Sequence, residues 1–216
     1  MRVFLSCLFF AVITPFSAFA QVELSFYGGG QSTRSSHVSG NDPTGIGLFS
    51  FQADWDDQAF EVPSYFGLRV TWWRNERFGW GIEMNHANIQ ASDSTLTANG
   101  LNDLALSDGL NLVTMNTYRR WRRPGRSIRP YIGAGLGLAV PNIQFDSGGG
   151  MTTGNQLTGP AIQWLAGASI PVSDKWSVFG EYRGSLAANS ADLLGGGDLN
   201  ARILTNAVNV GVSLDF

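Results

Sequence analysis

Two histidines and a short acidic stretch are the residues with which this sequence could do chemistry. His37 and His86 are the only histidines among the 216 residues. The chain between them carries a group of four carboxylates: Asp54, Asp56, Asp57 and Glu61. Carboxylate oxygens are hard ligands that suit a divalent cation, so these four are candidate metal ligands. Their spacing follows no strict calcium-loop pattern, and solvated loop charge is the simpler interpretation.

Glu83 precedes His86 in the segment "EMNHAN", and we take His86, His37 and Glu83 as the candidate catalytic residues. In a strand, residues three apart point to opposite faces, so Glu83 and His86 would not act from one side. The two histidines can meet only if the first long loop folds back over the strand that carries His86. The sequence contains no G-x-S-x-G motif of the kind that marks a serine hydrolase.

The elements that must position these residues are strands, because apolar and polar residues alternate with a period of two. Such alternation predicts strands with one apolar and one polar face. It recurs in eight stretches: 22–29, 65–72, 78–85, 111–118, 131–140, 162–170, 177–184 and 207–216.

The connections between these strands alternate in length. Short turns such as "RNER" and "PVSDK" alternate with four long loops, at 31–64, 90–110, 146–160 and 186–202. This plan predicts an all-β fold, an eight-stranded antiparallel transmembrane β-barrel with short periplasmic turns and long extracellular loops. A soluble sandwich would show the same alternation. Aromatic residues near the short turns favour the barrel, as a periplasmic belt: Trp72, Trp73, Phe78, Trp80, Trp121, Tyr131, Trp176 and Phe216.

An eight-stranded barrel is too narrow for a water-filled channel, so side chains must fill it. Buried charges have to be paired, and we therefore expect a hydrogen-bonded network inside the barrel rather than ion conduction. A catalytic pair of acids is the alternative interpretation. The polar face of the strands supplies the predicted inward set: Glu23, Tyr27, Arg69, Glu83, Asn116, Glu181, Arg183, Asn209 and Asp215.

The first twenty residues resemble an export signal. Arg2 is followed by the apolar run "VFLSCLFFAVI" and then by "AFA" before Gln21. We expect residues 1–20 to be a signal peptide cleaved after Ala20, and residues 21–216 to form the barrel in the bacterial outer membrane. A lipoprotein signal that uses Cys7 is the alternative.

Charge divides between the two predicted ends. The long loops carry many acids against Arg34 and, at the edge, Arg202, whereas the short turns are rich in arginine. The basic end suits the anionic phospholipid of the inner leaflet. Lipopolysaccharide, itself anionic, would need divalent cations to approach the acidic end. Export excludes a nucleic-acid partner, and we expect a monomer.

Two sets of segments carry family resemblances. "RPYIGAGLGLAVP" and "SDKWSVFGEYRGS", with the terminal Phe216, resemble the OmpA/OmpX-type barrels, and a C-terminal aromatic of this kind is similar to the signal that the outer-membrane assembly machinery reads. "SGNDPTGIG", "PSYFGLRVTWW" and "FGWGIEMNHA" resemble the alphaproteobacterial lipid A oxidases. That resemblance implies dioxygen-dependent oxidation of the proximal glucosamine of 1-dephosphorylated lipid A to 2-aminogluconate. Dioxygen would be the co-substrate, and a divalent metal is a candidate cofactor. The alternative is a non-catalytic barrel with a structural, membrane-stabilising or adhesive role.

Overall fold

The computed structural model of the protein describes residues 21–56 and 65–216. The expected signal peptide at residues 1–20 lies outside the described residues, as do the candidate metal ligands Asp57 and Glu61. Within the described residues, no helix is long and apolar enough to cross a membrane.

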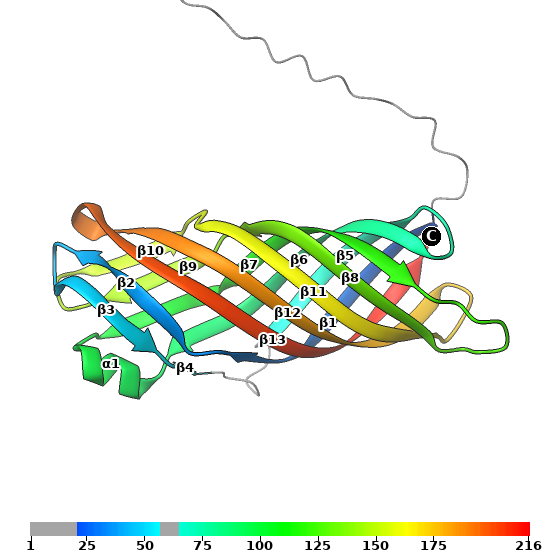
Figure 1. Cartoon of the computed structure of the whole chain (residues 1–216), viewed down its shortest axis with the longest axis horizontal. Helices are drawn as coiled ribbons and strands as arrows, with labels where there is room; N and C mark the ends of the chain where they lie inside the picture. Colours follow the sequence, from blue (N-terminus) through cyan, green and yellow to red (C-terminus); the bar gives the residue numbers. More distant parts are fainter. Residues whose placement is uncertain (1–20, 57–64) are drawn as a thin grey trace, which may run out of the picture.

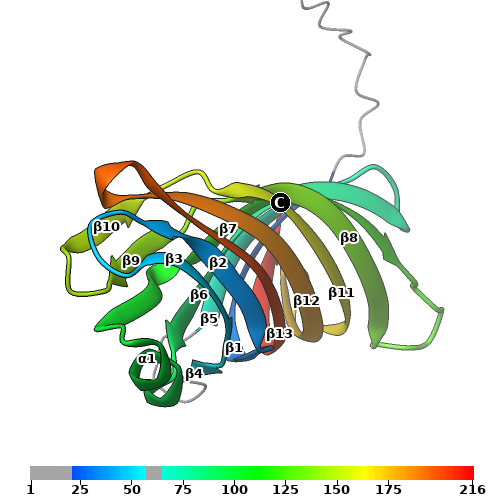
Figure 2. The ribbon, with the colours of Figure 1, turned by 60° about the vertical axis from the view of Figure 1, so that its left-hand side comes forward.

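Eight long antiparallel strands form a closed ring of pairings (Figures 1 and 2). They are β1 (Gln21–Thr33), β5 (Tyr65–Trp73), β6 (Phe78–Ala91), β7 (Asp103–Arg120), β8 (Arg129–Ala139), β11 (Gly159–Pro171), β12 (Trp176–Leu193) and β13 (Gly197–Asp215). Each of them pairs with the next one along the chain, and β13 pairs with β1. The predicted eight-stranded antiparallel barrel is therefore confirmed.

The faces of the strands identify the barrel as a transmembrane one. Along β13, Val208 and Val210 point outward and are 67% and 72% exposed, whereas Asn209 between them points inward and is buried. A barrel stable in water would show the reverse arrangement. Along β6 the outward apolar residues run from Phe78 to Met84 and end at His86. The eight-residue step from Phe78 to His86 covers about 26 Å along the strand, which at a tilt of about 40° rises about 20 Å and so spans most of the roughly 25 Å apolar band.

The two ends of the barrel differ as predicted. Residues 74–77, 121–128 and 172–175 form short connections at one end, which is the periplasmic end of the fold. The other end carries smaller elements: β2 (Ser36–Asp42), β3 (Gly47–Ala53), β4 (Trp55–Asp56), α1 (Asp93–Asn99), β9 (Asn142–Asp146), β10 (Met151–Asn155) and the 3-10 helix η1 (Leu194–Gly196). β2 continues the line of β1 and pairs with β13, so the wall extends beyond the membrane.

The extracellular connections are mostly strand rather than loop, which corrects their predicted extent. The pairing of β12 with β13 continues to Leu193 opposite Gly197, so the predicted loop at 186–202 is a hairpin. The physical reason is that the alternation of inward and outward residues continues through residues 186–202. Ala187, Leu199 and Ile203 point inward and are buried.

The barrel interior has a polar part and an apolar part. The predicted polar filling is confirmed for the half that lies nearer the short turns, where Arg69, Glu83, Glu181 and Arg183 are buried. The extracellular half instead has an apolar core that the polar-filling prediction did not include. Its fully buried members include Val38, Leu104, Ile143, Phe145 and Ile203.

Three hairpin tips meet over this apolar core, and we call their junction the tip contact. Asp42, at the end of β2, accepts hydrogen bonds from the backbone and hydroxyl of Thr44 and from the hydroxyl of Ser147 in the β9–β10 turn. An added Cβ on Gly149 would lie 1.8 Å from the carbonyl oxygen of Thr44, and one on Gly195 would lie 2.7 Å from its methyl group. The tips are therefore in close backbone contact.

Two members of the predicted aromatic belt point into the barrel instead of toward lipid. Trp73 and Tyr131 are only 5% and 8% exposed, since they share the inward parity of their strands. Their polar atoms donate to the interior carboxylates of Glu23 and Glu181. The outward aromatics at this end are confirmed, and Trp72 and Trp80 stack there with ring centroids 4.5 Å apart.

Candidate functional site

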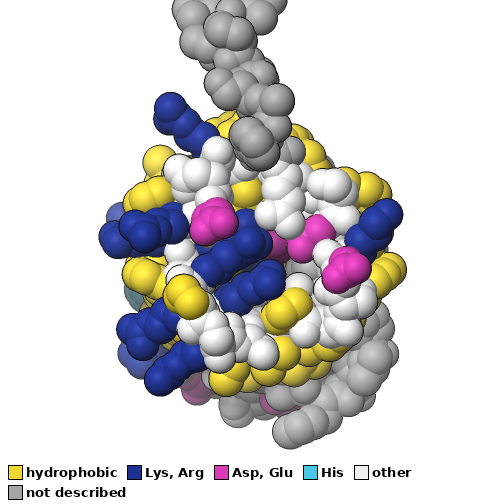
Figure 3. Space-filling view, turned by 90° about the vertical axis from the view of Figure 1, so that its right-hand side faces the viewer, with side chains coloured by type: hydrophobic (Ala, Val, Ile, Leu, Met, Phe, Trp, Pro, Cys, Tyr) yellow, Lys and Arg dark blue, Asp and Glu magenta, His cyan; other side chains and the backbone are white. Residues whose placement is uncertain are grey.

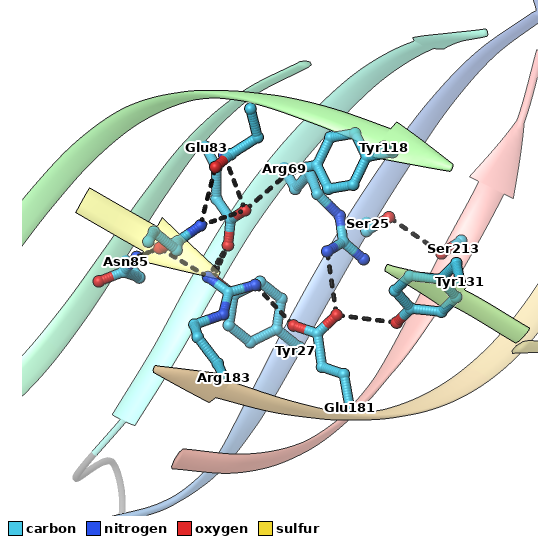
Figure 4. A network of polar contacts seen from close by, with 12 residues as sticks. Ser25, Tyr27, Arg69, Glu83, Asn85, Tyr118, Tyr131, Glu181, Arg183 and Ser213 are labelled. Carbon is cyan, nitrogen blue, oxygen red and sulfur yellow. Dashed lines mark hydrogen bonds and ion pairs between the residues drawn. The ribbon is translucent and has the colours of Figure 1, made fainter. Parts of the chain in front are cut away.

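Glu83 lies in a cluster of polar side chains inside the barrel, here called the interior network (Figure 4). Its carboxylate is fully buried. It accepts hydrogen bonds from Tyr118 and Gln163 at 3.1 Å and is also bonded to Tyr27 and Arg183. With all of these partners in place, Glu83 is satisfied as part of the barrel filling.

Glu181 occupies a matching position in the same network. Its carboxylate pairs with Arg69 at 3.0 Å and with Arg183 at 2.6 Å, and it accepts a hydrogen bond from Tyr131 at 2.8 Å. The Arg69 guanidinium lies 5.1 Å from the centroid of the Phe179 ring. Two carboxylates and two guanidiniums therefore compensate each other, as burial of charge requires.

The network leaves little free space below it. A cavity of about 20 Å³ lies beside Glu23, Arg69 and Tyr118 toward the short turns. That volume is about what one water molecule needs. The interior at this level is packed, and the chemistry open to a substrate lies on the outside of the barrel or at its extracellular end.

His86 stands at the outer edge of the lipid-facing band, as the parity of its strand predicts. Its ring stacks on Phe66 of β5 with centroids 4.8 Å apart, and Nδ1 is 3.0 Å from the side-chain oxygen of Asn111 on β7. The outward face of β6 changes from apolar to polar at this position. An amphipathic ring with a polar partner suits the head-group level of a membrane.

His37 lies on the extracellular extension, in a different part of the wall from His86. β2, which carries His37, extends the wall in line with β1, whereas His86 lies on β6, beyond β5, the neighbour of β1. Glu83 points to the interior and faces neither histidine. The structure therefore does not bring the three candidate catalytic residues together, and their roles remain predictions.

His37 lines an open hollow of about 540 Å³, here called the His37 hollow. Its Nε2 is 3.2 Å from the hydroxyl of Ser50 across the β2–β3 hairpin. Arg202 on β13 also lines the hollow, because Ala201 pairs with Val38 and so places Arg202 beside His37. The other lining residues are mostly polar or small: Ser39, Thr158, Pro160, Ala188, Asn189, Ser190, Asn200 and Ala201.

Arg202 is the residue that the sequence-based site prediction missed. Arg202 and Arg34 are the only lysines or arginines in the four predicted long loops, which otherwise carry acids. The isolation of Arg202 among acidic loop residues is the feature of the sequence that could have identified it as a candidate. The strand register needed to place Arg202 next to His37 appears only once β2 pairs with β13. The hollow thus combines a guanidinium, an imidazole and several amide and hydroxyl groups.

Two of the four predicted metal ligands, Asp54 and Asp56, lie within the described residues. Asp54 and Asp56 are exposed on either side of the buried Trp55. Within residues 21–56 and 65–216, no three His, Cys, Asp or Glu side chains gather into a group that could hold a metal ion.

Solved barrels of similar fold share little sequence with this chain. Neisserial surface protein A is 13% identical, with 91% of this chain and 96% of that chain covered and a TM-score of 0.47. The N-terminal β-barrel domain of OprF from Pseudomonas aeruginosa is 14% identical, with 91% and 98% covered and a TM-score of 0.46. The outer membrane protein AlkL is 12% identical, with 91% and 90% covered and a TM-score of 0.49. No family model and no curated protein matches the sequence.

Proposed function

We propose that this outer-membrane barrel binds the head group of lipid A in the His37 hollow and oxidises it, as the sequence resemblance to lipid A oxidases implies. One observation carries the proposal. Arg202 and His37 line the same hollow, on the outward side of the barrel wall and beyond the apolar band. Lipid A carries its sugars and phosphate at that height in the outer leaflet.

The groups of the hollow fit an anionic sugar. A guanidinium forms strong charge-assisted hydrogen bonds with phosphate. The exposed Asn200 and Ser190 supply neutral donors and acceptors that suit sugar hydroxyls. The acidic surroundings would otherwise repel such a ligand, so Arg202 is the residue on which binding depends most.

The proposed reaction converts the reducing-end hemiacetal of 1-dephosphorylated lipid A into an acid. The hemiacetal loses two electrons and two protons to dioxygen, which becomes hydrogen peroxide. The resulting lactone then takes up water, so the product carries one more oxygen atom than the substrate. In this proposal His37 accepts a proton in the hollow.

Mass spectrometry of lipid A tests this proposal. Cells that express the gene are expected to gain one oxygen atom on 1-dephosphorylated lipid A, and only when dioxygen is present. Arg202→Gln should lower the oxidised fraction about 10-fold or more, because a hydrogen bond to a charged group is lost. Arg34→Gln is the matched control, since Arg34 is exposed on the same side but outside the hollow.

Two results would contradict it. If lipid A gains no oxygen atom in the presence of the gene, the oxidase proposal fails. If Arg34→Gln lowers the product as much as Arg202→Gln does, the His37 hollow is not the site.

A non-catalytic role is the second candidate, and the tip contact favours it. The three hairpin tips close the extracellular end over an apolar core, which gives the molecule a firm outer surface. Such a surface suits a barrel that stabilises the membrane or adheres to a partner. Under this alternative, deletion of the gene would weaken the resistance of cells to detergent and leave lipid A chemically unchanged.

A further inference from the structure

A second hollow lies at the opposite end of the barrel, on the turn between β7 and β8. Its volume is about 500 Å³, and we call it the Arg123 hollow. The residues that line it are Trp121, Arg123, Arg126, Ser127, Ile128 and Pro130. We propose that this hollow binds the head group of an anionic phospholipid from the inner leaflet.

The local sequence explains how two arginines come to share the hollow. In "RPGR", Pro124 fixes one backbone angle and Gly125 takes a positive φ of 73°, which is the pattern of a type II turn. The amide of Arg126 donates to the carbonyl of Arg123 at 3.1 Å and closes the turn. Arg123 and Arg126 therefore occupy the two ends of the turn, and both line the hollow. Two guanidiniums that line one hollow suit a phosphate group, which can accept paired hydrogen bonds.

The hollow opens toward the lipid rather than into the barrel. Pro130, one of its lining residues, shares outward parity on β8 with Ile132, whereas Tyr131 between them is buried. Leu136 continues the same outward line and is 70% exposed. An acyl chain attached to a head group in the hollow would lie along this apolar line.

A third arginine borders the same surface. Arg119 pairs across from Ile132 in the β7–β8 register, and its guanidinium lies 5.2 Å from the Trp121 ring centroid and 5.4 Å from that of Phe78. The exposed Ile128 adds an apolar side to the turn. Aromatic rings and arginines together are typical of a membrane interface.

The charge of this whole end favours an anionic occupant. Figure 3 faces the short-turn end and shows Lys and Arg side chains gathered on it, with few acidic ones. The short connections and the adjoining strand ends supply these basic residues: Arg74, Arg77, Arg119, Arg120, Arg122, Arg123, Arg126, Arg129 and Lys175. Their acidic neighbours in the turns are Glu76 and Asp174. Basic residues at a membrane surface attract anionic lipid.

Native mass spectrometry of the full barrel, released from nanodiscs that contain equal amounts of phosphatidylglycerol and phosphatidylcholine, tests this inference. The wild-type protein should retain phosphatidylglycerol preferentially. Arg123→Gln combined with Arg126→Gln should lower that preference about 30-fold, the loss expected for two arginines at an anionic surface. Arg74→Gln combined with Lys175→Gln removes the same charge from the other two turns and should leave most of the preference in place.

Heat-modifiable migration on a gel confirms that each variant is folded before it is compared. Equal loss in both double variants would show diffuse surface attraction and overturn the proposed site, as would a wild-type protein without lipid preference. Added inorganic phosphate should leave the lipid bound. If inorganic phosphate alone displaced the lipid, the acyl chain would contribute nothing to binding. That result would overturn the assignment of the hollow to a lipid.

Discussion

Glycines that face the interior decide whether the interior network can form. The clearest case is Gly67 on β5, where an added Cβ would lie 2.1 Å from the hydroxyl oxygen of Tyr27 and 2.3 Å from the ring carbon that carries it. Tyr27 is itself bonded to Glu83 and Arg183. The absence of a side chain at Gly67 therefore provides the space that this tyrosine occupies.

Gly67→Ala is expected to destabilise the barrel by about 1–3 kcal/mol, because the added methyl group would overpack the interior and displace the Tyr27 ring. Urea unfolding in detergent micelles, followed by tryptophan fluorescence, measures the change. Gly28→Ala is the matched control, since its added Cβ would lie 3.5 Å from the nearest atom, at ordinary contact distance. An equal effect of the two substitutions would contradict this account of Gly67.

The charged groups of the network were predictable from sequence, but their partners were not. Strand parity identifies Arg69, Glu83, Glu181 and Arg183 as inward-facing residues, and all four are buried. The position of a residue along its strand predicts which face of the wall it occupies. It does not predict the level of the residue along the barrel axis, because that level depends on the strand register. The pairing of Glu83 with Arg183, residues 100 positions apart, follows from that register.

At the scale of elements, the tip contact holds the extracellular hairpins together. Burial acts to raise the pKa of the Asp42 carboxyl, but hydrogen bonds from Ser147 and Thr44 outweigh it and lower that pKa below its usual value. A carboxyl with a lowered pKa stabilises the folded state above its unfolded pKa of about 3.9. This stabilisation is lost as the pH falls through the lower pKa of the folded state.

The tip contact is therefore expected to loosen in acid. Amide hydrogen exchange at residues 44–46, corrected for its intrinsic pH dependence, should stay slow near neutral pH and become faster below about pH 4. Asp42→Asn should exchange faster already at neutral pH and lose most of the pH dependence. Exchange that is unchanged by this substitution would show that Asp42 does not hold the tips together.

The extracellular elements were the least predictable part of the fold. Two of the short turns, 74–77 and 172–175, have only four residues and so hold the flanking strands next to each other, and the predicted ends of those strands agree with the structure to within one residue. The longer connections carry an alternation of buried and exposed residues that extends the strands, as at Ala187 and Ile203, beyond the stretches predicted as strands. The apolar core at this end depends on contacts between hairpins, such as the stacking of Phe49 on Phe145 at 5.4 Å.

At the scale of the whole molecule, the two hollows lie at opposite ends of one closed barrel. The His37 hollow belongs to the acidic extracellular end, and the Arg123 hollow to the basic short-turn end. The outward apolar band between them fixes the position of both relative to the bilayer. Each proposal can therefore fail without the other, because neither site shares a residue with its counterpart.

The central claim is that lipid A occupies the His37 hollow, and site-specific photocrosslinking in living cells tests it most directly. A photoreactive amino acid at Ser39, which lines the hollow, should crosslink to lipopolysaccharide. The same group at Leu194, exposed at a hairpin tip outside the hollow, is the control and should give little product. Crosslinking at Ser39 that does not exceed crosslinking at Leu194 would contradict the account.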